Sequence, residues 1–499
     1  MSNVPLHKSA TTGFVWNVLG AVFRAVSGFT VNVILSRLLG PEPFGTMAVT
    51  LALLNFGTLV LDSGLSATLV QRQYLTKDDI NGVQGFQLLV GSILAVAIWL
   101  LAYPLAKLFQ QPELVHIAPW LAIMIMLTSM LQVPQALLRR RLNFKVVQQA
   151  QMFSYLVGYV IVGIVLALQG FGIWSLIVAQ LIQMAVNLAW VYTKAKNPFR
   201  PTLKGERSLV NFGASILATN LVNWITMNAD IFAVGSQFGK STLGVYNRMN
   251  FLLGTPINIL TSSIQPIMVS TVARVQMEKT KVKNAYLAVV ELVAWVALPL
   301  FLSLAFVGHT LVEGIYGYRW VTGIPLVLPI SIVMAISSLG MLPGPVLTGL
   351  GRVEVELRST VVNLLVSTPF FIMAAMHSAA FVAWAVVLSR LSFCFLLNRS
   401  LAHYLEMTLI NYMSRIVRPL SMAFILSIAL WIVDHALTTL EIGSIVRLAI
   451  IVIMGIVVYS LIFFRFPELL MDTRARQLLT GLGSYNRIRW IIFRRVSHD

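Results

Sequence analysis

The sequence predicts an all-α polytopic membrane protein with about 14 transmembrane helices. Hydrophobic residues make up 58% of the 499 positions and charged residues only 11%, a balance outside the range of soluble domains. Apolar stretches of membrane-spanning length recur along the whole chain, which leaves no room for a separate soluble domain of the usual size. Basic residues gather between alternate pairs of these stretches, as the positive-inside rule expects of a multi-pass protein.

The first predicted span covers residues 13–35, and its only charged residue is Arg24, near the middle. A helix of this length, at about 1.5 Å per residue, crosses a hydrocarbon core of about 30 Å. An arginine at that depth costs about 2.5 to 3.5 kcal/mol on insertion scales, so it must face protein partners or a water-filled cavity. Arg24 is therefore the first candidate for a functional residue.

The later spans follow one another through glycine- and proline-rich turns and charged loops. They are predicted near residues 44–70, 83–106, 114–137, 147–168, 172–193, 209–235, 243–269, 284–307, 322–349, 359–377, 379–398, 416–433 and 443–464. A charged linker with two prolines at 194–207 separates the sixth span from the seventh. This linker is the best candidate for a boundary between two halves of the protein.

The distribution of basic residues predicts the orientation. If both termini are cytoplasmic, 28 of the 36 basic residues fall on the cytoplasmic side and five on the other, with Arg24, Arg248 and Arg390 inside spans. This asymmetry agrees with the positive-inside rule, and one span more or fewer would destroy it. Topology thus explains the net charge of +18, and no nucleic-acid partner is predicted.

Two sets of matching positions indicate an internal repeat. Gly239 and Gly244 repeat the spacing of Gly40 and Gly45 at an offset of 199. A phenylalanine and a tryptophan at 381 and 384 repeat those at 171 and 174 at an offset of 210. Two six-helix lobes with the same orientation would form a parallel pseudo-twofold repeat. We therefore predict lobes at 1–200 and 201–400, followed at 401–499 by two additional helices and a basic cytoplasmic tail.

Six ionisable residues lie within the predicted spans, where such residues are costly and usually serve function. They are Arg24, Asp62, Asp230, Arg248, Glu291 and Arg390. Asp62, Arg248 and Glu291 lie closest to span ends, so snorkelling to the interface is an alternative for them. Arg390 aligns with Gln180 at the offset of 210, and a role as an interhelical pin is as plausible as a ligand contact.

Arginines in a membrane cavity suit an anionic ligand, because the guanidinium binds phosphate with two parallel hydrogen bonds and stays charged. We therefore predict substrate binding by Arg24, Arg248 and Arg390. The carboxylates of Asp62, Asp230 and Glu291 would be counter-charges or would bind H⁺ or Na⁺ for coupling. The seven histidines are scattered and Cys394 is the only cysteine, so neither a metal site nor another cofactor is predicted.

A basic loop follows the fourth span and contains Arg139, Arg140, Arg141 and Lys145. Loops of this kind usually anchor the topology near anionic headgroups. We favour that role over a specific substrate site.

Several stretches resemble one family, the polysaccharide and oligosaccharide-lipid flippases of the multidrug/oligosaccharidyl-lipid/polysaccharide exporter superfamily. They are SRLLGPEPFG (36–45), LDSGLSATLVQRQ (61–73), QALLRRRLNFK (135–145), GIWSLIVAQL (172–181) and LGVYNRMNFLLGTPINIL (243–260). The likeness is strongest to the colanic-acid-exporter-like branch. It implies two six-helix lobes that alternate between inward and outward openings, and a polyprenyl-diphosphate-linked sugar repeat unit as substrate. It also implies that Arg24 lines the cavity, and Asp62 and Arg248 lie on spans where the family carries further cavity charges.

The same resemblance implies a place in the bacterial inner membrane, among lipids and possible polymerase and export partners for exopolysaccharide or lipopolysaccharide synthesis. Three other functions stay open. A cation-coupled multidrug exporter would use Asp62 and Asp230 to bind cations, although the intramembrane arginines disfavour it. A non-transporting scaffold would recruit enzymes through its basic loops. An enzyme acting on lipid-linked sugars is the least favoured, because no external loop is long enough to hold an acid/base pair.

Overall fold

The computed structural model describes residues 6–62, 69, 74–195, 200–202 and 208–465. All regular secondary structure over these ranges is helical, which confirms the predicted fold class. The chain forms two compact units, residues 1–248 and 249–499. The lobe boundaries at 200 and 400 stay a prediction from the sequence repeat.

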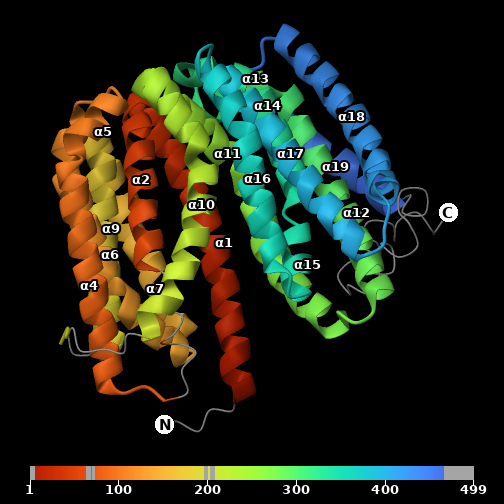
Figure 1. Cartoon of the computed structure of the whole chain (residues 1–499). Coiled ribbons are helices and arrows are strands. Elements are labelled where there is room, and N and C mark those ends of the chain that lie inside the picture. The colour runs from red at the N-terminus through yellow and green to blue at the C-terminus, as the bar shows by residue number, and fades with distance from the viewer. Residues whose placement is uncertain (1–5, 63–68, 70–73, 196–199, 203–207, 466–499) are drawn as a thin grey trace. The chain divides into compact units, whose positions relative to one another are not determined.

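The first unit contains ten helices and the start of an eleventh among the described residues (Figure 1). They are α1 (Leu6–Leu39), α2 (Pro41–Leu61), α4 (Lys77–Leu100), α5 (Ala102–Leu108), α6 (Glu113–Arg140), α7 (Phe144–Tyr155), the π-helix η1 (Leu156–Gly163), α8 (Ile164–Leu168), α9 (Ile173–Ala195), α10 (Ser208–Gln237) and α11 (Gly239–Val275). Helix α6 packs against α4, α2 and α9, and α1 packs against α7.

The second unit contains the rest of α11 and the remaining helices. They are α12 (Lys279–Phe306), α13 (Gly308–Tyr316), the 3₁₀-helix η2 (Tyr318–Gly323), α14 (Ile324–Gly340), α15 (Pro343–Gly349), α16 (Val353–Ala375), α17 (Ala379–Tyr404), α18 (Leu409–Thr439) and α19 (Ser444–Arg465). Its core gathers around α12, which packs against α14 and α18. In the α17–α18 loop, a hydrogen bond of 2.6 Å from Lys279 and the charge of that ammonium lower the pKa of Glu406.

Each of the 14 predicted spans overlaps one or more helices. The end of the second predicted span (63–68 and 70), most of the predicted linker at 194–207 and the predicted basic tail after residue 465 lie outside the described residues. By length and apolarity, 12 described helices can cross a membrane, or 13 if α11, which bends by 41° between Asn258 and Ser263, is one span. The predicted span that is not among these is the seventh, at 209–235, which corresponds to α10, a helix of 30 residues with several asparagines. The protein is therefore a multi-pass membrane protein, and 14 is an approximate count.

The two glycine pairs that repeat in the sequence lie where the start of α2 touches the start of α11. Gly40 directly precedes α2 and Gly239 is the first residue of α11, with φ of 75° and 76°, a region open to glycine at little cost. Four residues into α2 and five into α11, a Cβ on Gly45 would lie 1.8 Å from the carbonyl oxygen of Lys240, and a Cβ on Gly244 would lie 1.9 Å from that of Pro41. The two contacts are related by the same offset of 199, so the starts of α2 and α11 cross reciprocally.

Candidate functional site

Arg24 is exposed near the middle of α1, and two glutamines of α7 hold its guanidinium. Its Nη1 donates to Oε1 of Gln148 and, at 2.8 Å, to Oε1 of Gln151. Among the described residues no carboxylate forms an ion pair with Arg24. Amide acceptors orient a guanidinium without neutralising it, so the positive charge of Arg24 is available to a ligand.

Small residues on one face of α1 allow this arrangement. Gly20, Arg24, Gly28 and Asn32 follow one another at intervals of four, so they share a face of the helix. A Cβ on Gly20 would lie 2.1 Å from Oε1 of Gln148. The absence of that atom lets the glutamine reach the arginine, as small residues do where membrane helices approach closely.

Arg248, on α11, is only 6% exposed. Its Nη1 donates to Oδ1 of Asn32 at 2.6 Å and its Nη2 to Oδ1 of Asn247 at 3.1 Å. Its Cζ also lies 4.3 Å from the centroid of the Phe44 ring, within the range of a cation–π interaction. Protein groups therefore surround Arg248, and the side chain does not snorkel to the interface. The sequence analysis missed Asn32, although its place two turns from Arg24 is a usable signal.

Two tyrosines lie close to this face of α1, and the hydroxyl of Tyr155 would be 3.9 Å from a Cβ on Gly28. The rings of Tyr155 and Tyr159 stack with centroids 5.3 Å apart, and the hydroxyl of Tyr159 donates to Oε1 of Gln180 on α9 at 2.7 Å. Tyr159 belongs to the π-helical turn η1, a distortion that often occurs at functional sites. Gly158 permits the contact with α9, because its Cβ would lie 2.6 Å from the carbonyl oxygen of Ala179.

Beside Gln180 is a polar cavity of about 220 Å³ within the first unit. Helices α2, α6 and α9 line it with Thr58, Thr128, Leu131, Gln132, Gln135, Gln180, Gln183, Met184 and Asn187. The lining contains amides and hydroxyls and no ionisable side chain. The sequence analysis considered only charged residues and missed this set.

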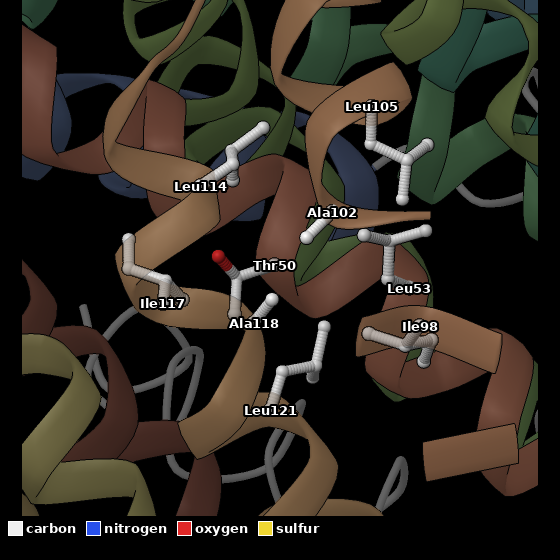
Figure 2. A pocket seen from close by; sticks show the side chains of 9 residues that line it. All are labelled: Thr50, Leu53, Ile98, Ala102, Leu105, Leu114, Ile117, Ala118 and Leu121. Carbon is white, nitrogen blue, oxygen red and sulfur yellow. The ribbon is translucent and has the colours of Figure 1, made fainter. Parts of the chain in front are cut away.

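A second cavity in the same unit is apolar and small. Figure 2 shows Thr50 surrounded by the aliphatic side chains that line it. Its volume is about 10 Å³, close to the minimum for a single water molecule, and the Thr50 hydroxyl donates to the carbonyl oxygen of Thr46. This cavity is a packing gap and not a ligand site.

The two predicted acidic residues of the first unit lie in different surroundings. Asp230, on α10, accepts a hydrogen bond of 2.8 Å from the hydroxyl of the buried Tyr246. Asp62 is exposed at the C-terminal end of α2, where its backbone N–H donates to the carbonyl oxygen of Thr58. Their roles as coupling or counter-charge residues stay predictions.

In the second unit, Glu291 is 4% exposed and its Oε2 lies 3.1 Å from Nη1 of Arg415. The pair borders a cavity of about 450 Å³ together with Ser414, Val417 and Arg418. Glu291 is thus buried and does not snorkel, and the sequence analysis did not single out its partner Arg415. Arg390 is half-buried on α17, and substrate binding by it stays a prediction.

The residues of the predicted basic loop form the junction of α6 and α7: Arg139 and Arg140 lie in the last turn of α6, and Lys145 lies in the first turn of α7. Nη1 of Arg140 donates to the carbonyl oxygen of Leu69, and Nη1 of Arg141 to that of Ala195, both at 2.9 Å. Nζ of Lys145 lies 5.4 Å from the centroid of the Trp16 ring, and Arg139 is exposed. Ala195 is the last residue of α9, so its carbonyl is one that the helix end leaves without an intrahelical partner. These hydrogen bonds connect the junction of α6 and α7 to neighbouring segments of the first unit. No cluster of metal-binding side chains occurs among the described residues.

Comparison with known proteins identifies the family. Residues 34–325, more than half of the chain, match the family described as "Polysaccharide biosynthesis protein". The chain belongs to this family. This family member is 25% identical over 434 residues to the teichuronic acid biosynthesis protein TuaB of Bacillus subtilis, covering 85% of this chain and 88% of TuaB. It is 20% identical over 383 residues to the lipopolysaccharide biosynthesis protein WzxC of Escherichia coli, covering 75% and 77% of the two chains.

The fold of this family member is also known from solved structures. It matches the inward closed conformation of the lipid II flippase MurJ with a TM-score of 0.72 and 12% identity, over 91% of this chain and 99% of MurJ. At that identity the likeness concerns the fold alone. Together these matches confirm the resemblance to the polysaccharide flippase superfamily.

Proposed function

We propose that this protein is a flippase that moves polyprenyl-diphosphate-linked oligosaccharide repeat units across the cytoplasmic membrane for surface polysaccharide synthesis. The observation that carries this proposal is Arg24, a charged guanidinium at mid-span that amides orient and no described carboxylate neutralises. A diphosphate is the anionic group of such a lipid, and arginine binds it with strong, charge-assisted hydrogen bonds. The names of the relatives TuaB and WzxC support a role in polysaccharide synthesis.

The proposed mechanism is alternating access. The sugar headgroup must cross while the lipid tail stays in the bilayer, so the binding site has to open to each side in turn. Arg24 would hold the diphosphate, with Arg248 and Arg390 as further cationic residues. An H⁺ or Na⁺ gradient would drive transport through Asp62, Asp230 or Glu291, without a cofactor and without a chemical change of the substrate. Polymerase and export proteins would act on the product, and both termini would lie in the cytoplasm.

Transport in proteoliposomes tests the proposal. Purified protein is reconstituted with a fluorescent polyprenyl-diphosphate oligosaccharide, and an impermeant quencher reports the molecules that reach the far leaflet. Removal of one charge-assisted contact costs about 1.5 to 3 kcal/mol, so Arg24→Ala should slow transport about 10- to 100-fold. Arg274→Ala makes the same chemical change at an exposed position near the end of α11, and we expect it to leave the rate within about twofold.

Other outcomes would favour other functions. Equal rates for Arg24→Ala and the wild type would refute the role of the arginine. Extrusion of cationic drugs without lipid transfer would favour the multidrug exporter. Absence of both activities in folded protein supplied with lipid-linked oligosaccharide from the producing cells would favour a scaffold.

A further inference from the structure

We propose that the polar cavity between α2, α6 and α9 binds uncharged sugar hydroxyls of the lipid-linked oligosaccharide, separately from the arginine that would hold the diphosphate. This inference rests on the proposed function and assigns the two parts of the substrate to different places in the first unit. We name this cavity, with the residues given above, the amide cavity.

The polar residues of the amide cavity occupy one face of each helix. Thr128, Gln132 and Gln135 follow the spacing i, i+4, i+7 on α6, and Gln180, Gln183 and Asn187 follow i, i+3, i+7 on α9. Both spacings place side chains on a single helical face. The amides of two neighbouring helices therefore converge on one space.

The chemistry of this lining matches a sugar better than an ion. An amide side chain both donates and accepts hydrogen bonds, as a sugar hydroxyl does. No side chain that lines the cavity carries a charge, so a phosphate or a cation would lack an opposite charge there. A volume of about 220 Å³ corresponds to on the order of seven water molecules, which is room for one sugar residue and part of its hydration.

Asn187 supplies a second, independent observation. Its Oδ1 is buried and accepts no hydrogen bond from any residue that the structure describes. A buried acceptor without a donor costs free energy. A sugar hydroxyl in the amide cavity would supply the donor that this oxygen lacks.

Comparison with α17, the helix that corresponds to α9 in the sequence repeat, shows whether the amides of α9 are needed for helix packing. At the offset of 210, Gln183 and Asn187 of α9 correspond to Phe393 and Leu397 of α17. Leu397 is 1% exposed in the hydrophobic core of the second unit. A helix at this place in the repeat thus packs well with apolar residues, so the amides of α9 are not required for packing.

The amide cavity also adjoins residues that lie close to α1. Gln180 lines the cavity and accepts the hydrogen bond of Tyr159, which stacks on Tyr155. The hydroxyl of Tyr155 would lie 3.9 Å from a Cβ on Gly28, one turn of α1 from Arg24. One lipid headgroup can therefore place its sugar near the amides and its charged part toward Arg24.

The test compares affinities for two lipids in purified protein. One is lipid-linked oligosaccharide isolated from cells that produce the protein, and the other is the same polyprenyl diphosphate without sugar. We expect wild-type protein to bind the first lipid about tenfold more tightly, the equivalent of two hydrogen bonds. Q183L/N187L should abolish this difference in affinity. Arg24→Ala should lower the affinity for both lipids by the same factor, so the roughly tenfold preference should remain.

Two further variants keep the test decisive. Gln135→Ala removes an amide from the α6 side, so it should reduce the preference even if the double variant fails to fold. Gln169→Leu makes the glutamine-to-leucine change at an exposed position and should preserve the preference. Equal wild-type affinities for the two lipids, or an unchanged preference in Q183L/N187L and Gln135→Ala, would overturn the inference. Wild-type protein that binds neither lipid would instead overturn the proposed function.

Discussion

The reciprocal glycine contact between α2 and α11 predicts a specific response to added methyl groups. Ordinary van der Waals contact begins at 3.4 Å, whereas a Cβ on Gly45 or Gly244 would meet a backbone oxygen at 1.8 or 1.9 Å. Either alanine therefore forces the two helix starts apart by about 1.5 Å, because a helical backbone cannot yield as a flexible side chain can. Overpacking of this kind costs about 1 to 3 kcal/mol.

The two substitutions should also be coupled. Once one methyl group has separated the helices, the second enters a gap that is already open. The loss of stability in the double variant G45A/G244A should then fall short of the sum of the single losses by about 1 kcal/mol or more. Additive losses would mean that the two positions respond independently.

Unfolding by denaturing detergent in bicelles, followed by tryptophan fluorescence, measures these losses. Gly254→Ala is the matched control, because Gly254 lies within α11 and its Cβ would meet only the end of the Met334 side chain, with the methyl carbon at 3.6 Å and the sulfur at 3.9 Å. Without a clash, alanine in a helix stabilises by about 0.5 to 1 kcal/mol relative to glycine. If Gly45→Ala matched Gly254→Ala in stability, the close crossing of α2 and α11 would be refuted.

Two further predictions concern buried and basic residues. Arg415→Met should destabilise by about 3 kcal/mol, because it leaves the carboxylate of Glu291 buried without its cation, and Glu291→Gln added to it should recover part of that loss in the same unfolding assay. Arg140→Ala and Arg141→Ala should each lower stability by about 1.5 kcal/mol through the loss of a charged hydrogen bond to a carbonyl, whereas the exposed Arg139→Ala should change it by less than about 0.5 kcal/mol. Equal effects of the three alanines would contradict the structural role of the basic loop.

The sequence predicted the helices well because hydropathy depends on local composition. Each predicted span overlaps helical structure among the described residues, and the glycine pairs related by the offset of 199 lie where α2 and α11 touch. Arg24 was identified because one charge in an apolar stretch is conspicuous. Its partners Gln148 and Gln151 were not identified, because they lie more than a hundred residues away in the sequence. Sequence spacing does not show which helix packs against α1.

The sequence analysis did not identify the residues of the amide cavity, and the reason is physical. A neutral amide is cheaper to bury than a charge, so glutamine and asparagine stand out little in an apolar helix. Their helical spacing on α6 and α9 was readable, but only the packing of these helices shows that the two faces meet. The π-helical turn η1 has no local sequence signature, and it places Tyr159 beside Gln180.

Arg24 and Arg248, the two arginines of the first unit that lie within predicted spans, differ in a way that their sequence context could not reveal. Arg248 is buried against Phe44 and bonded to Asn32, so protein groups already replace much of its hydration and a ligand would have little left to bind. Arg24 is exposed and held on one side by two amides, which fixes its direction and lowers the conformational entropy that binding would otherwise cost. A transport site needs a cation that is oriented in advance but still able to release its ligand on the far side. Arg24 meets that requirement better than Arg248, whose charge chiefly organises the helices α1, α2 and α11 around it.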